Sequence, residues 1–193
     1  MLSTRSACQD GPHHVSRLVW VVLAVATGIF LGHAIMASGY AIFKHEGGNW
    51  LHHHTRTYAL YNGIDQDNPL RGLAWGAGGQ WDQKTILGLP GTYDHNSARI
   101  HLIDGTYGRT RWAGLAYWCH HCTHSHVKYN LTYLSGKTPY YRRAVACQEI
   151  GHILGLDHAP GDCMGAGYHR QWTNGVDSDT ATSLSNKYIN TGH

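Results

Sequence analysis

Residues 148–158 read QEIGHILGLDH and form the second half of the clearest helical pattern in the sequence. This pattern begins at Pro139, and proline is favoured at the first position of a helix because the N–H it lacks would have no partner there. The helix is expected to stop at Gly155, because glycine readily adopts the left-handed conformation that often follows a helix C-terminus. The sequence thus predicts a helix that runs into the quoted stretch and then turns sharply.

The quoted stretch also carries side chains of the kind that bind metal. Gln148 and His152 are four residues apart and share one face of a helix, and Glu149 lies beside that face. The turn at Gly155 lets His158 return toward His152. Imidazole nitrogens are common zinc ligands, and a glutamate beside a zinc ion can act as a general base. We therefore interpret this segment as a candidate metal site, with Glu149 as the candidate catalytic residue.

The stretch resembles the motif of metzincin metalloproteases, which is H-E-x-x-H-x-x-G-x-x-H followed by a methionine turn. The chain matches this pattern at Glu149, His152, Gly155, His158 and Met164. The segments VACQEIGHILGLDH and CMG look most similar to a group of small secreted actinobacterial proteins that also place glutamine first.

This resemblance spans about Arg56–Ile189 and implies an α+β, zincin/metzincin-like fold, with a mixed twisted sheet, an active-site helix and a C-terminal helix. It implies that His152 and His158 ligate Zn²⁺, that Glu149 is the general base, and that Met164 forms a floor beneath the metal. The implied protein is a secreted zinc-dependent endopeptidase that acts on peptides or proteins.

The chain departs from the family pattern at Gln148, where the motif has a histidine. A neutral amide is a poorer zinc donor than imidazole, so the site should hold its metal more weakly. Three outcomes remain open: Gln148 ligates through its side-chain oxygen, a histidine from elsewhere in the chain supplies the ligand, with 119–126 as the favoured source, or the site is catalytically inactive. In the last case the chain is an exported metzincin-fold protein that acts in binding or metal capture. The presence of Glu149 favours activity.

Four cysteines follow the N-terminal segment, namely Cys119, Cys122, Cys147 and Cys163. In an oxidising compartment, four cysteines favour two disulfides, with three possible connectivities. The local pairing of Cys119 with Cys122 and of Cys147 with Cys163 is the preferred one.

The run CHHCTHSH at 119–126 has two interpretations. It is either a second zinc site, formed by the two cysteines with His124 and His126, or a short disulfide loop with solvated histidines. The disulfide loop is favoured because thiols in an oxidising compartment tend to pair.

Outside these segments, strand and helix patterns follow one another along the chain. Strands are expected at 56–62, 97–104, 112–118 and 126–134, and helices at 70–84, 139–155 and 176–190. The metzincin resemblance implies that 126–134 (HVKYNLTYL) is the edge strand that holds an extended peptide substrate.

The N-terminal part is expected to direct export. An arginine-containing segment precedes fifteen uncharged residues, Leu18–Gly32, and small residues follow, as in a secretory signal. An uncleaved membrane anchor is the alternative. The expected organisation is a signal peptide or N-terminal anchor at 1–43, a leader or loop at 44–55, and the metalloprotease-like domain at 56–193. Both alternatives place the domain outside the cytoplasm, either secreted or anchored to the outer face of the cell membrane.

The composition narrows the class of protein further. Charged residues make up only 14% of the 193 residues, and the net charge is +3 without any basic stretch. This excludes a highly charged disordered chain and gives no electrostatic support to a nucleic-acid partner. A membrane contact is expected only through an uncleaved N-terminal segment. The chain has 17 histidines but only two glutamates, Glu46 and Glu149, so the position of Glu149 within the motif is informative.

Overall fold

A computed structural model of the chain describes residues 56–117, 124–159, 161–165 and 175–190. The chain divides into the units Met1–Ile35 and Met36–His193, and every described residue belongs to the second. The predicted signal or anchor at 1–43 and the leader at 44–55 lie outside the described residues. Among the helices that are described, none has the length and apolar character needed to cross a membrane.

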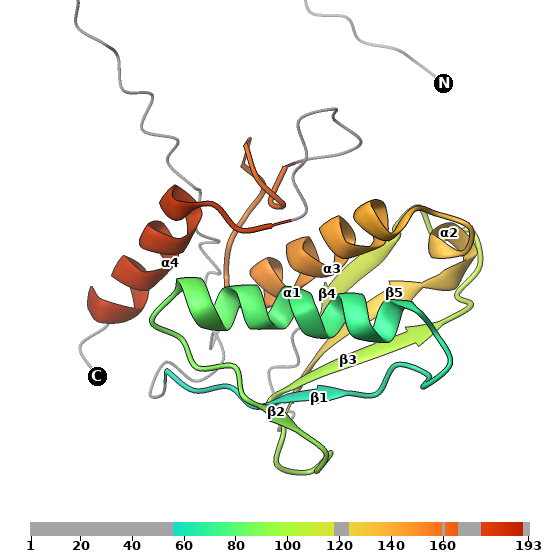
Figure 1. Cartoon of the computed structure of the whole chain (residues 1–193), viewed down its shortest axis with the longest axis horizontal. Helices are drawn as coiled ribbons and strands as arrows, with labels where there is room; N and C mark the ends of the chain where they lie inside the picture. Colours follow the sequence, from blue (N-terminus) through green and yellow to red (C-terminus); the bar gives the residue numbers. More distant parts are fainter. Residues whose placement is uncertain (1–55, 118–123, 160, 166–174, 191–193) are drawn as a thin grey trace, which may run out of the picture. The chain divides into compact units, whose positions relative to one another are not determined.

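Five strands form one mixed sheet in the order β2-β1-β3-β5-β4 (Figure 1). Their bounds are β1 Leu60–Asn62, β2 Gly91–Thr92, β3 Ile100–Gly105, β4 Gly114–Tyr117 and β5 Ser125–Asn130. Strands β2, β1, β3 and β5 run parallel, whereas β4 pairs antiparallel with β5. Strand β4 therefore forms one edge of the sheet.

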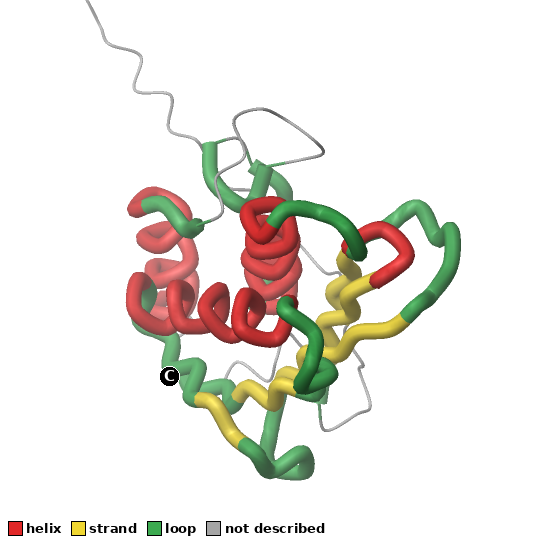
Figure 2. The backbone as a smooth tube through the Cα atoms, turned by 45° about the vertical axis from the view of Figure 1, so that its right-hand side comes forward, coloured by secondary structure: helices red, strands yellow, loops and turns green. Residues whose placement is uncertain are grey.

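The described helices are α1 Leu70–Lys84, α2 Leu131–Leu134, α3 Pro139–Ile153 and α4 Ser178–Asn190. Helices α1 and α3 pack against each other beside the sheet, and α4 contacts α1 (Figures 1 and 2). The mixed sheet with helices that the sequence predicts is thus confirmed. Helix α1 has its predicted bounds, and the turn after α3 contains Gly155 with a φ of 96°.

Alternation along β3 and β5 determines which side chains enter the core. Successive residues of a strand point to opposite faces of the sheet. The inward residues, which face the helices, are fully buried: Ile100, Leu102, Val127 and Tyr129. His101 and His126 alternate with them and therefore point to the opposite face.

The prediction for 126–134 is wrong in two respects. Strand β5 ends at Asn130, and Leu131–Leu134 forms α2 instead. The Asn130 side chain accepts a hydrogen bond from the N–H of Thr132, which caps this helix and diverts the chain from the sheet. In addition, β5 lies between β3 and β4, so it is not an edge strand. The edge next to β5 is formed by β4, which lies within the strand predicted at 112–118.

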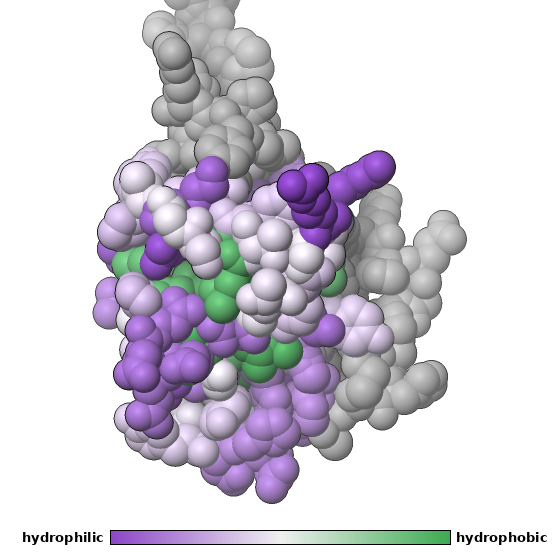
Figure 3. Space-filling view, turned by 90° about the vertical axis from the view of Figure 1, so that its right-hand side faces the viewer, coloured by the Kyte–Doolittle hydropathy of each residue, from purple (hydrophilic) through white to green (hydrophobic). Residues whose placement is uncertain are grey.

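The exposed surface contains both polar and apolar residues. On the face shown in Figure 3, hydrophilic and neutral residues predominate, and apolar ones form small patches between them. Strand β4 presents large apolar side chains to solvent, since Leu115 is 36% and Tyr117 51% exposed.

Gly151 marks a close approach between α3 and its neighbours. A Cβ built at this position would lie 2.3 Å from Sδ of Met164 and 2.8 Å from the ring of Trp81. Both side chains are fully buried, and the Trp81 indole N–H donates to the carbonyl of Cys147 at 3.0 Å, which holds the ring against α3. The space beside Gly151 therefore has no room for a methyl group.

Gly151→Ala should lower the free energy of unfolding by about 1–3 kcal/mol, the usual cost of overpacking a core. Gly79→Ala is the matched control, because it also lies inside a helix but its added Cβ would meet nothing within 4 Å. That control should raise the free energy of unfolding by about 0.5–1 kcal/mol through helix propensity. Urea unfolding of the full chain, followed by circular dichroism, measures both. Equal effects of the two substitutions would contradict the close contact at Gly151.

Candidate functional site

His152 on α3 and His158 beyond its end face each other. Their Nε2 atoms lie 3.1 Å apart. Two nitrogen ligands of one tetrahedral zinc ion, each about 2.0–2.1 Å from the metal, lie roughly 3.4 Å apart. The turn at Gly155, with its positive φ, lets the chain bring His158 back toward α3. The two histidines are therefore spaced as two ligands of one ion.

Backbone contacts orient the His152 ring. Its Nδ1 lies 2.8 Å from the carbonyl oxygen of Leu156. Since a carbonyl only accepts, Nδ1 carries the proton and the lone pair is on Nε2, the atom nearest His158. In metal-binding histidines the ring nitrogen that does not bind the metal typically donates such a hydrogen bond. Burial lowers the pKa of His152, which favours the neutral form that ligates metal. His158 is exposed, so the site is open to solvent.

The Gln148 side chain is buried on the same helix. Its amide nitrogen donates to the carbonyl of Gly165 at 2.8 Å. The nitrogen is thus engaged, and the side-chain oxygen is the atom of this residue that can offer a lone pair to a metal. Ligation by Gln148 stays a prediction.

Glu149 is buried against the edge strand, with 7% of its surface exposed. A Cβ built on Gly114 would lie 2.4 Å from its Cγ and 2.8 Å from its Oε1, so the carboxyl side chain fills the space that a side chain at Gly114 would need. Burial raises the pKa of Glu149 to about 7, and a hydrogen bond from the backbone N–H of Ala116 opposes this rise. A carboxyl group with a pKa near neutrality can both accept and release a proton.

Tyr129 on β5 is electrostatically coupled to Glu149. Burial, followed by the nearby Glu149 carboxylate, raises the pKa of its hydroxyl. The hydroxyl is buried and has no hydrogen-bond partner within the part of the chain that the structure describes. The sequence gives no role to Tyr129 or to Gly114, because both reach Glu149 from strands distant along the chain.

Met164 lies in a turn that is fastened to α3. The neighbouring Cys163 is disulfide-bonded to Cys147, with the sulfurs 2.00 Å apart, so the predicted local pairing is confirmed for these two cysteines. The Met164 N–H donates to Oδ1 of Asp162 at 2.7 Å, and its Sδ packs beside Gly151. This places Met164 next to the helical turn that carries His152, and its role as a floor beneath a metal stays a prediction.

The predicted residues within 119–126 divide into two groups. Cys119 and Cys122 lie outside the described residues. His124 and His126 lie close enough to His101 to hold a metal ion together with it, and they are not grouped with His152. The structure therefore gives no support to either as the third ligand of the α3 site.

His101 and His126, which form a cluster with His124, disfavour positive charge. Burial lowers the pKa of His101 to about 4, with additional repulsion from His124, His95 and His126. The pKa of His126 is lowered as well, again mainly by burial. The sequence does not single out His101, although both HLI at 101 and HVK at 126 place a histidine on the outer face of a strand.

No model of a known protein family and no curated protein matches the sequence. Among solved structures, similarity is found to that of myroilysin, with a TM-score of 0.41 and 10% sequence identity. The match covers 53% of this chain and 48% of that chain, so it spans about half the length of each.

Proposed function

We propose that the chain is an exported zinc-dependent endopeptidase of the metzincin type. The observation that carries this proposal is the 3.1 Å distance between Nε2 of His152, on α3, and Nε2 of His158, beyond the end of that helix, together with the buried Glu149 on α3. Export is supported by the signal-like N-terminal sequence and by the disulfide between Cys147 and Cys163.

Three side chains could bind a zinc ion here, and one of them, Gln148, is a weak donor. His152 and His158 would hold the ion as neutral imidazoles, and the side-chain oxygen of Gln148 would be the third protein donor. A zinc ion at this place would lower the pKa of its bound water toward about 7 and polarise the scissile carbonyl.

Glu149 would transfer a proton from the attacking water to the leaving amine. It would take the proton from the attacking water and later donate it to the leaving amine, the two halves of general acid–base catalysis. The backbone N–H of Ala116 positions its carboxylate, and Gly114 leaves the room in which the carboxylate lies.

An extended peptide is the substrate that the site favours. Strand β4 is an edge of the sheet, and such edges can bind a further strand through backbone hydrogen bonds. Gly114 brings this strand against Glu149, so a peptide lying along β4 would pass beside the general base. The exposed side chains of Leu115 and Tyr117 offer apolar contacts to it.

One observation favours a non-catalytic alternative, in which the chain acts in binding or metal capture. The Gln148 amide is bonded to Gly165, so this residue already has a structural role that needs no metal. Zinc content and cleavage separate the two functions.

The full chain, purified with its metal, should cleave an unfolded protein substrate, lose cleavage when a chelator removes the metal, and regain it when zinc is added. The reason is that Glu149 can act only on a water activated by the ion. His152→Ala, treated in the same way, should not regain activity. Cleavage that survives complete metal removal would contradict the proposal, and bound zinc without any cleavage would support the alternative.

A further inference from the structure

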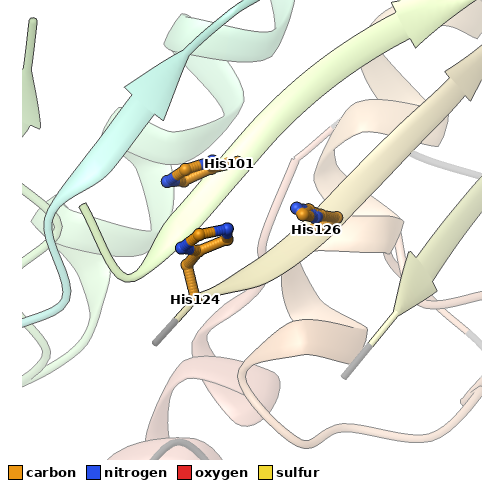
Figure 4. Close-up of side chains that lie close together, drawn as sticks. All are labelled: His101, His124 and His126. Carbon is orange, nitrogen blue, oxygen red and sulfur yellow. The ribbon is translucent and has the colours of Figure 1, made fainter. Parts of the chain in front are cut away.

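Two histidines on neighbouring strands and a third just before one of these strands meet on the face of the sheet opposite to α3 (Figure 4). His101 on β3 and His126 on β5 are register partners of a parallel pair, so their side chains lie side by side on one face. His124 is two residues before His126 and shares that face. Its ring stacks on the ring of His101, with centroids 4.1 Å apart and planes 7° from parallel.

The ring nitrogens lie close enough for a shared ion. Each histidine offers one nitrogen, and these three atoms lie within 4.8 Å of one another. Nitrogens bound to one tetrahedral zinc ion lie roughly 3.4 Å apart, and the lone pair of each ligating ring points at the ion. The ring of His124, which stacks on that of His101, would therefore have to turn toward the ion when it binds.

The central histidine is already oriented for ligation. Nε2 of His101 lies 3.0 Å from the carbonyl oxygen of His95, so this nitrogen carries the proton and Nδ1 keeps the lone pair. A backbone carbonyl that fixes the tautomer in this way is the usual outer partner of a metal-bound histidine. His101 is only 1% exposed, so the surrounding residues hold its ring in place.

We propose that His101, His124 and His126 bind one divalent transition-metal ion, of the class of zinc, that prefers imidazole nitrogen. The ion would link β3 to the beginning of β5 and so act as a structural centre. None of its ligands belongs to the site on α3, so this proposal is independent of the proteolytic function.

The test uses the full chain with His152→Ala and His158→Ala, which removes the histidine pair of the α3 site. After treatment with a chelator, this variant is titrated at pH 7 with zinc alone, in competition with a chromophoric chelator. It should bind one ion tightly. Adding His124→Gln or His126→Gln should weaken that binding by about 100-fold or more, since even outer partners of a ligand contribute 10–100-fold. Both positions are partly exposed, and thermal unfolding of the metal-free variants checks that they fold.

The control replaces His52, His53 and His54 by glutamine in the same background, because this run is another source of imidazole in the chain. Its zinc affinity should equal that of the background. The proposal is overturned if the background binds no zinc tightly, if neither His124→Gln nor His126→Gln weakens binding, or if the loss follows the His52–His54 replacement instead. Because the α3 pair is absent throughout, none of these results depends on whether that site is active.

Discussion

Glu149→Gln should abolish peptide cleavage while the zinc content of the α3 site stays the same. Glutamine has nearly the same shape as glutamate, so it can occupy the space beside Gly114. It cannot accept the proton of the attacking water, and loss of a positioned general base typically lowers kcat/KM by about 10²–10⁴-fold. Cleavage of a fluorogenic peptide, measured beside the bound zinc of the same sample in a chain that also carries His126→Gln, gives both quantities.

The matched control is Glu46→Gln, which removes the only other glutamate of the chain. It should leave both cleavage and zinc content unchanged. If Glu149→Gln cleaved as fast as the unchanged chain, Glu149 could not be the general base. If the variant lost its zinc together with its activity, the carboxylate would have to be assigned to the metal instead.

Gln148→His should raise the zinc affinity of the α3 site by about 100-fold or more, because an imidazole replaces a neutral amide as the third donor. The new side chain would lie one helical turn before His152, on the same face of α3. The affinity is best measured in a chain that also carries His126→Gln, so that the second histidine cluster does not bind the added zinc.

Gln83→His is the control for this gain, because it adds a histidine at an exposed position of α1. It should leave zinc affinity unchanged. An unchanged affinity in Gln148→His itself would count against His152 and His158 as ligands, since a third imidazole strengthens a site only where the other two already bind.

The helices could be predicted because local residues define them. The Thr138 side chain accepts a hydrogen bond from the N–H of Tyr141 at the start of α3, and Pro139 follows that cap. Helix α1 has its predicted bounds in spite of its interior glycines. At Gly78 the lack of a side chain allows close packing, since a Cβ there would lie 3.1 Å from Leu60. Tertiary packing thus outweighs the lower helix propensity of glycine at this position.

The sheet could be predicted only in part, because strand order depends on contacts between distant residues. The apolar pattern of 126–134 does not show that Asn130 would cap a helix, nor that β4 would pair outside β5. The same limit applies to the cluster on the outer face. His101 and His126 meet only because β3 and β5 pair in one particular register, and that register could not be predicted from the sequence.

The candidate site on α3 could be predicted to a larger extent, because its main residues follow one another within 147–164. The residues that interact with the Glu149 carboxyl group from other strands could not be predicted. Ala116 reaches it from β4 and Tyr129 from β5, and only the folded sheet brings these strands beside α3.

The disulfide between Cys147 and Cys163 closes a covalent loop that contains Gln148, Glu149, His152 and His158. In the reduced chain the same residues would be present, but no side-chain bond would join α3 to the turn that carries Met164. The bond therefore limits how far these two segments can separate, whether or not a metal ion lies between them.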